Sequence, residues 1–429
     1  MSSSFFIFTA HSNETIMHAK QFLYGAAIVV LVSTSGCASK NTSSKTTTDG
    51  DTSKLPPVET QKPNSSYKPA FEGQTRIAGV KTVTPYKVEK IAEKLGRPWA
   101  ITPLPDGRVI ITEKSGYMEI HDANGVLVKK ITGLPAVDDG SQGGLLDVAL
   151  DPDFVNNKTI YWSFSEKYGV GNLTSVAKGQ LNEATGKVDN PVVIFRATPA
   201  LDNSKQHYGS RLLFDKDGNL FVSSGERSVL EGRVQSQLLQ SGLGKVFKIT
   251  KEGKPAPGNP FINQRGAMPE IYTYGHRNVQ SLAIHPVTGD LWEAEFGPRG
   301  GDELNLIKPG KNYGWPIITY GIEYSGEPIG TPIQQKEGME QPVYYWDPVL
   351  SPGGMIFYKG NAIPEWENNL FISGQSSSHL ARLVIVDNKV VGEERIMEDV
   401  KERVRDVAYI DGMLYTITDS GNMYRISKK

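Results

Sequence analysis

One pattern recurs six times along this chain: an apolar segment enters a polar turn and leaves it as a second apolar segment. The turns contain Asp-Gly, Asn-Gly or Thr-Gly-Asp, which tolerate the positive backbone angles of tight hairpins. The flanks are rich in Ile, Val, Phe, Tyr and Trp, as strands are. The copies lie roughly 46 to 73 residues apart, and they begin at Trp99, Leu145, Arg211, Ser281, Gly354 and Val404.

Six such units, each long enough for four strands, predict an all-β fold: a six-bladed β-propeller with four-stranded antiparallel blades. The chain has 429 residues, of which 38% are hydrophobic, which is enough for a core. We expect residues 81–429 to form the propeller, with long insertions in the middle blades. A β-sandwich with a second domain is the alternative. In a propeller, loops from every blade meet at one mouth of the channel, so residues far apart in sequence can share one pocket.

The segment before the repeats has a different character. Met17 to Cys37 ("MHAKQFLYGAAIVVLVSTSGC") has one positive charge, an apolar run and then small residues, which is the layout of a secretory signal. We therefore expect residues 1–36 to be a signal peptide whose true start is Met17. The apolar run, Phe22 to Val32, is shorter than the roughly 20 residues that a membrane span needs, which disfavours a transmembrane anchor.

Cys37 is the only cysteine, so no intrachain disulfide can form. The sequence "TSGC" resembles a bacterial lipobox, although Thr34 stands where leucine is usual. It predicts a lipid anchor on the periplasmic face of a bacterial membrane, and the alternative is an ordinary signal peptide and a free periplasmic protein. Residues 37–80 are rich in Ser, Thr, Lys and Pro, which predicts a flexible tether.

The net charge of −1 gives no basic bias, which excludes nucleic acid as an expected partner. Two candidate site motifs lie just before repeats. His207, in "HYGSRLLFD", has the residue type of a base that works near neutral pH; the alternative is a histidine that merely bonds its loop. The second motif, "YGHRNVQ", contains Arg277 and Asn278. The arginine offers a planar fork of donors suited to carboxylate or quinone oxygens, and the alternative is a surface arginine paired with an acid.

Two further motifs concern ions. The stretch "EFGPRGGDELNLIKPGKNYGWP", from Glu295 to Pro316, combines glycine and proline carbonyls with carboxylates, the oxygen ligands that Ca²⁺ prefers; a solvated acidic turn is the alternative. The lack of a Cys or His cluster there argues against zinc. Arg403 and Arg405, in "RVRDV", alternate on one strand face and either bind a polyanion or form a charged edge strand.

Taken together and in order, the motifs resemble one family. They are "WAITPLPDG", "QGGLLDVALDPDF", "HYGSRLLFD", "YGHRNVQ", "GPRGGDELN", "KNYGWP", "YSG" and "RVRDV". They look like those of the soluble aldose sugar dehydrogenases, six-bladed propellers that depend on pyrroloquinoline quinone (PQQ). The resemblance extends from about Thr84 to the C-terminus.

The resemblance implies roles for individual residues. His207 matches the general base, Gln142 in "SQGGLLD" borders sugar and cofactor, and Arg277 and Asn278 match contacts to the quinone region of PQQ.

Further PQQ contacts are implied at Tyr324 in "YSG" and at Arg403 and Arg405, which would face its carboxylates. One departure stands out, because family members often carry a lysine in the loop that here reads "GQSS" around Gln375.

Four residues match calcium ligands. Gly297 and Pro298 correspond to backbone carbonyl ligands of the Ca²⁺ that touches PQQ. Glu303 and Tyr313 match ligands of a second, structural Ca²⁺.

The implied activity is oxidation of aldose sugars at C1 to aldonolactones. His207 would take the hydroxyl proton as hydride passes to PQQ, with Arg277 and Ca²⁺ stabilising the negative charge. The electrons would then pass to an acceptor that the sequence does not identify. The rival interpretations are a non-catalytic propeller that binds a saccharide or protein, and a calcium-dependent sugar lactonase, which would favour acids over arginines in the channel.

Overall fold

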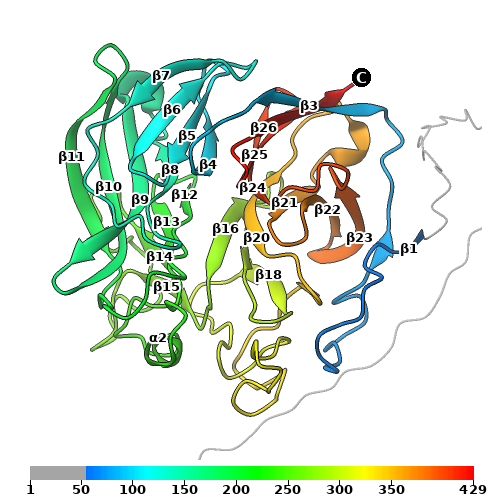
Figure 1. Cartoon of the computed structure of the whole chain (residues 1–429). Coiled ribbons are helices and arrows are strands. Elements are labelled where there is room, and N and C mark those ends of the chain that lie inside the picture. The colour runs from blue at the N-terminus through cyan, green and yellow to red at the C-terminus, as the bar shows by residue number, and fades with distance from the viewer. Residues whose placement is uncertain (1–54) are drawn as a thin grey trace, which may run out of the picture. The chain divides into compact units, whose positions relative to one another are not determined.

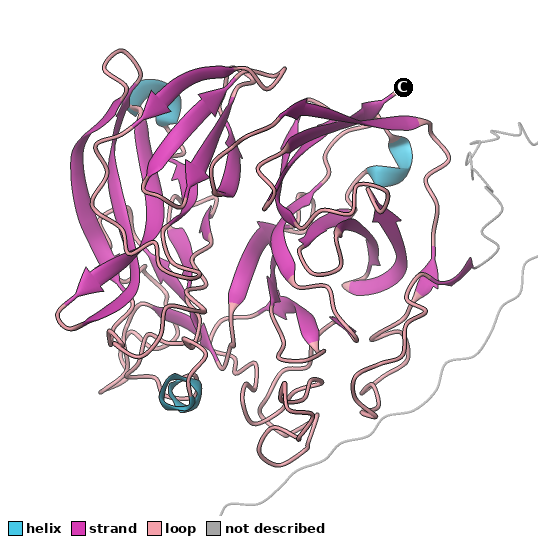
Figure 2. Ribbon diagram, in the orientation of Figure 1, coloured by secondary structure: helices cyan, strands magenta, loops and turns pink. Residues whose placement is uncertain are grey.

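The computed structural model describes residues 55–429, which consist almost entirely of strands and loops (Figures 1 and 2). Six sheets follow one another along the chain, and consecutive strands within each sheet pair antiparallel. The predicted six-bladed propeller is confirmed. The helical elements are short: α1 (Phe154–Asn157), α2 (Leu230–Gln235) and the 3-10 helix η1 (Pro364–Trp366).

The first three sheets contain β4 (Pro98–Pro103), β5 (Val109–Glu113), β6 (Tyr117–His121) and β7 (Leu127–Ile131); β8 (Leu145–Leu150), β9 (Thr159–Tyr168), β10 (Gly171–Asn182) and β11 (Lys187–Arg196); and β12 (Leu212–Phe214), β13 (Leu220–Ser223), β14 (Lys245–Ile249) and β15 (Ile271–Tyr274). The last three contain β16 (Val279–Ile284), β17 (Leu291–Glu295), β18 (Asp302–Ile307) and β19 (Tyr344–Trp346); β20 (Pro352–Phe357), β21 (Leu370–Gly374), β22 (His379–Val386) and β23 (Lys389–Ile396), extended by β2 (Ala78–Gly79) and β1 (Leu55–Pro57); and β24 (Val404–Ile410), β25 (Met413–Thr418), β26 (Met423–Lys428) and β3 (Tyr86–Ala92).

The first strand of each sheet lies at the centre of the ring. The inner strands are β4, β8, β12, β16, β20 and β24. Each contacts the next one along the chain, and β24 contacts β4. Each predicted repeat begins within or next to one of them. The N-terminal strand β3 pairs with the C-terminal strand β26, for example Val88 with Ile426, so the two ends of the chain share one blade and close the ring.

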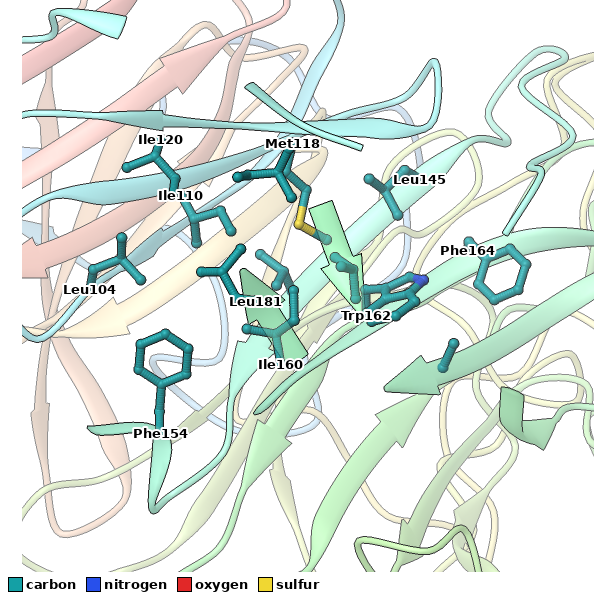
Figure 3. Close-up of a cluster of buried hydrophobic side chains, with 14 residues drawn as sticks. Leu104, Ile110, Met118, Ile120, Leu145, Phe154, Ile160, Trp162, Phe164 and Leu181 are labelled. Carbon is teal, nitrogen blue, oxygen red and sulfur yellow. The ribbon is translucent and has the colours of Figure 1, made fainter. Parts of the chain in front are cut away.

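Side chains on the two faces of a blade pack against different neighbours. In β9, Ile160 and Trp162 join a cluster with Ile110 and Met118 of the first blade (Figure 3). Tyr161, which points to the opposite face, packs with residues of the third blade. Because both faces are covered, these strands are continuous apolar runs rather than alternating ones.

The expected insertions in the middle blades are present. The connection between β13 and β14 contains α2, and the connection between β18 and β19 extends from Ile307 to Tyr344. The first connection contributes Glu226, and the second contributes Tyr313 and Trp315, to the site described below.

Residues 55–80 form a packed N-terminal segment, which corrects the expectation of a flexible tether for this part of the chain. The strand β2 pairs parallel with β23 at the edge of the fifth blade. The carboxylate of Asp347 accepts backbone N–H groups of Asn64 (2.7 Å) and Ser65 (3.2 Å). Glu59 pairs with Arg395 at 2.6 Å, and Gln74 is fully buried. Hydrogen bonds to a sheet edge and to loops therefore order a segment that has few apolar side chains.

The predicted signal peptide, the start at Met17, the lipid anchor at Cys37 and residues 37–54 of the tether lie outside the described residues. Residues 55–429 contain no candidate for a membrane-spanning helix.

Candidate active site

A cavity of about 200 Å³ lies at the centre of the ring, and all six blades contribute to its wall. Polar and cationic side chains line it together with a few aromatic and apolar ones. The lining residues are Trp99, Lys114, Ser141, Gln142, Leu146, Tyr208, Gly209, Asn278, Gln280, Phe296, Gln375, Arg403 and Arg405.

His207 lies in the loop before β12 and is held at both its backbone and its ring. Its N–H donates to Oε1 of Gln142 at 2.8 Å, and its Nδ1 lies 2.8 Å from Oε1 of Glu226. Because a carboxylate only accepts hydrogen bonds, Nδ1 carries the proton and Nε2 keeps a free lone pair. Burial, reinforced by the charge of Arg277 and only partly offset by Glu226, lowers the pKa of His207 to about 4. The ring is therefore a neutral base at pH 7.

The next residues along this loop are also fixed. The guanidinium of Arg227, which is buried, lies 4.0 Å from the ring centroid of Tyr208 and donates to the Gln206 carbonyl at 2.9 Å. Gly209 has a φ of +64°, and its N–H donates to Oδ1 of Asn278 at 3.0 Å. A Cβ at Gly209 would lie 2.6 Å from Ser224, so only glycine fits here. These contacts hold the histidine loop against the cavity.

One side of the cavity is cationic. The guanidinium groups of Arg403 and Arg405 share the single carboxylate of Asp419, at 2.8 and 2.7 Å. The two arginines outweigh the effect of burial and hold the pKa of Asp419 below its ordinary value. Gln375, at the position without a lysine, accepts a hydrogen bond from Nη2 of Arg403 at 3.1 Å. Two positive charges against one negative charge give this wall an affinity for anions.

Arg277 is buried and turned toward the glycine-rich loop, residues 296–301, which joins β17 to β18. Its Nη1 donates to the carbonyl of Gly297 at 2.5 Å and to that of Phe296 at 3.1 Å. Its guanidinium lies 5.3 Å from the ring centroid of Trp315. Its charge adds to the effect of burial in lowering the pKa of His207.

The glycine-rich loop is a close-packed backbone structure. A Cβ at Gly297 would lie 2.3 Å from Gly301, so the chain can pass here only without a side chain. Asp302 holds the loop: one carboxylate oxygen accepts the N–H of Gly297 at 2.9 Å, and the other accepts those of Leu350 and Ser351 at 2.7 Å each. Burial raises the pKa of Asp302 to about 6 despite these bonds.

A cluster of buried acids lies beside this loop. Nδ1 of His276 lies 3.1 Å from Glu295 and 3.6 Å from Glu293, and the three residues could each offer a ligand atom to one metal ion. Burial favours neutral His276, but the two carboxylates outweigh it and raise its pKa to about 9. Glu303, whose pKa burial also raises, faces Glu295 across the β17–β18 pair. The Tyr313 ring stacks on His276 at 4.7 Å.

The predicted site residues fall into two adjoining groups and one outlier. Gln142, Asn278, Arg403 and Arg405 line the central cavity, and His207 bonds to Gln142 at its edge. A second group lines a smaller neighbouring cavity: Arg277, Gly297, Glu303 and Tyr313. Pro298 is buried next to Gly297. Tyr324 is 71% exposed and lines neither cavity.

Sequence reasoning missed several residues of the site. Glu226 ends the motif "SSGE" after β13, and Lys114 lies in the turn after β5. No local sequence pattern marks either residue, because each contacts a partner from a different loop. Glu293 and Glu295 did have one: the alternation in "WEAEFG" places both on one face of a strand.

Comparison with known proteins identifies relatives along most of the chain. The sequence profile of the Glucose / Sorbosone dehydrogenase family matches residues 95–425. The aldose sugar dehydrogenase YliI of Escherichia coli (strain K12) is 39% identical over 350 residues, which are 80% of this chain and 93% of the relative.

Solved structures agree. The apo crystal structure of the soluble aldose sugar dehydrogenase from Escherichia coli has a TM-score of 0.76 and 38% identity, and the match covers 80% of this chain and all of that one. The PQQ-bound aldose sugar dehydrogenase of Streptomyces coelicolor has a TM-score of 0.66 and 26% identity, covering 81% and 99%. The chain therefore belongs to the Glucose / Sorbosone dehydrogenase family, which confirms the resemblance to soluble aldose sugar dehydrogenases.

Proposed function

We propose that this protein oxidises aldose sugars at C1 to aldonolactones, with PQQ as its cofactor and Ca²⁺ as its metal. The observation that carries the proposal is the buried, neutral ring of His207, oriented by Glu226 beside a cavity with a cationic wall. The activity named for the Escherichia coli relative and the PQQ bound by the Streptomyces coelicolor relative support it.

The residues of the cavity fit PQQ, which is flat and carries three carboxylates. Arg403 and Arg405 would bind carboxylates, and their excess charge over Asp419 suits a polyanion. Gln142 and Asn278 would contact its polar edge. When bound, PQQ supplies the acceptor for the hydride that leaves C1 of the sugar.

His207 would act as the general base. Its Nε2 would accept the proton of the C1 hydroxyl, which would prepare C1 to give up its hydride to the acceptor that PQQ supplies. Glu226 holds the ring in the tautomer that this step needs. Arg277 would place its positive charge where negative charge develops.

Calcium fits the glycine-rich loop and the acidic cluster, because the available donors are mostly oxygens. The carbonyls of Gly297 and Pro298 would bind one ion and Glu303 and Tyr313 a second. The Tyr313 hydroxyl bonds to Leu306 and Lys308, so this residue would contribute its main-chain carbonyl. Oε2 of Glu293 is buried without a hydrogen-bond partner, which a cation nearby would compensate.

Reconstitution tests the proposal. Apoprotein is mixed with PQQ and Ca²⁺ and given a panel of aldoses with a dye acceptor, and we expect sugar-dependent dye reduction that requires both additions. His207→Ala should bind PQQ and lose turnover, whereas wild-type turnover in that variant would contradict the base assignment. Binding of sugar without oxidation would favour a non-catalytic module, and hydrolysis of lactones without PQQ would favour a lactonase.

A further inference from the structure

Lys114 is a third cationic side chain in the wall of the central cavity, besides Arg403 and Arg405. We propose that Lys114, from the turn between β5 and β6 of the first blade, binds an anionic group of PQQ together with Arg403 and Arg405. The inference rests on the proposed function, because it assigns a ligand to the same cavity. Lys114 would supply positive charge from a part of the wall that is remote in sequence from Gln375. The loop around Gln375 itself has no lysine.

The backbone of Lys114 is fixed on both sides. Its N–H donates to the carbonyl of Arg97 at 2.9 Å, and its own carbonyl accepts the N–H of Leu145 at 3.0 Å. Gly144 packs against it so closely that a Cβ there would lie 2.8 Å from Cβ of Lys114. The root of the side chain is thus held in place before any ligand arrives, which lowers the entropy lost on binding.

The ammonium group keeps capacity for a ligand. Nζ donates one hydrogen bond, to the carbonyl of Ser141 at 2.7 Å, and an ammonium has three N–H donors. Within residues 55–429, Lys114 forms no ion pair, and the nearby carboxylate of Asp419 is already shared by the two arginines. Three cationic side chains therefore line the cavity, and the acid beside them, Asp419, pairs with only two of them.

The charges around Lys114 make its protonation sensitive to an anion. Arg97 and Arg405 repel its positive charge, and Asp139 and Asp419 attract it. Burial, followed by the two arginines, lowers the pKa of Lys114 to about 8. A carboxylate bound beside it would raise that pKa again, so PQQ binding should take up a proton at pH 8 to 9 and weaken as the pH rises through this range.

Calorimetric titration of calcium-loaded apoprotein with PQQ tests the assignment without using turnover. We expect Lys114→Met to weaken binding about ten- to one-hundredfold, the range for one charge-assisted hydrogen bond. Lys114→Arg should bind within a few-fold of wild type. Lys216→Met removes an exposed lysine outside the cavity, which pairs only with Asp217, and should bind as wild type does.

The pH dependence separates ligand binding from a purely structural role in holding the Ser141 loop. Between pH 7 and 9.5, the affinity of wild type should fall, while the affinities of Lys114→Met and Lys114→Arg should stay level. Lys114→Met binding within twofold of wild type, or with the same pH dependence, would overturn the inference alone. Failure of wild type itself to bind PQQ would overturn the proposed function as well. Melting curves of the apoproteins show whether each variant is folded.

Discussion

Replacing Glu226 by glutamine tests how the structure prepares His207 for catalysis. The change keeps the shape of the side chain and its ability to accept the Nδ1 hydrogen bond at 2.8 Å, but it removes the negative charge. In the present structure the hydrogen bond and charge of Glu226 raise the pKa of His207, against the larger lowering by burial and Arg277. Without that charge the imidazolium that forms during proton transfer is less stable.

The size of the effect follows from the kind of bond. A charge-assisted hydrogen bond is about twice as strong as a neutral one, so the variant should lose about 1–2 kcal/mol of transition-state stabilisation. That corresponds to about a 5- to 30-fold lower kcat/KM. Since Glu226 does not line the central cavity, most of the loss should lie in kcat.

The assay is the dye-linked oxidation of an aldose by reconstituted enzyme across a range of pH. In wild type, kcat/KM should stay level from pH 7 to about 5 and fall as His207 protonates toward its pKa of about 4. In Glu226→Gln this fall should shift to lower pH. Glu252→Gln, which makes the same change in an exposed pair with Lys178, is the matched control. Unchanged kcat/KM in Glu226→Gln, or a fall that shifts to higher pH, would show that the charge of Glu226 does not stabilise the imidazolium of His207.

Two further predictions concern stability. Burial raises the pKa of Glu293 to about 7, so between about pH 4.5 and 7 the folded, metal-free protein binds more protons than the unfolded chain. The metal-free protein therefore loses stability as the pH rises through that range. A chelator should lower the melting temperature by about 5 °C at pH 7.5 and by less at pH 5.5, and equal shifts would count against a cation at the acidic cluster. Asp347→Ala removes the acceptor for Asn64 and Ser65, so it should lower the free energy of unfolding by about 1–3 kcal/mol and speed proteolytic cleavage within residues 55–77; cleavage at the wild-type rate would show that these bonds do not order the N-terminal segment.

The propeller could be predicted from the sequence because the patterns that indicate it lie within each repeat. Each repeat has its own turn residues and apolar flanks, and six hairpin units of this kind have few ways to bury both faces of every sheet. The inner strands consequently begin within two residues of the predicted repeat starts.

The site was only partly predictable, since its geometry depends on contacts between blades. Gln142 and His207 are 65 positions apart yet share a hydrogen bond, and nothing near Glu226 or Lys114 in the sequence shows which cavity or partner they face. The N-terminal segment was misjudged for a related reason. Composition measures apolar burial, but residues 55–80 are ordered by hydrogen bonds to a sheet edge and to Asp347.

A crystal structure of the protein with PQQ and Ca²⁺ would show whether the cofactor binds beside His207. We expect PQQ in the cavity between Gln142 and Arg405, with its quinone oxygens near His207 and a calcium ion at the carbonyls of Gly297 and Pro298. An empty cavity at saturating PQQ, or PQQ bound with its quinone turned away from His207, would contradict the proposed function.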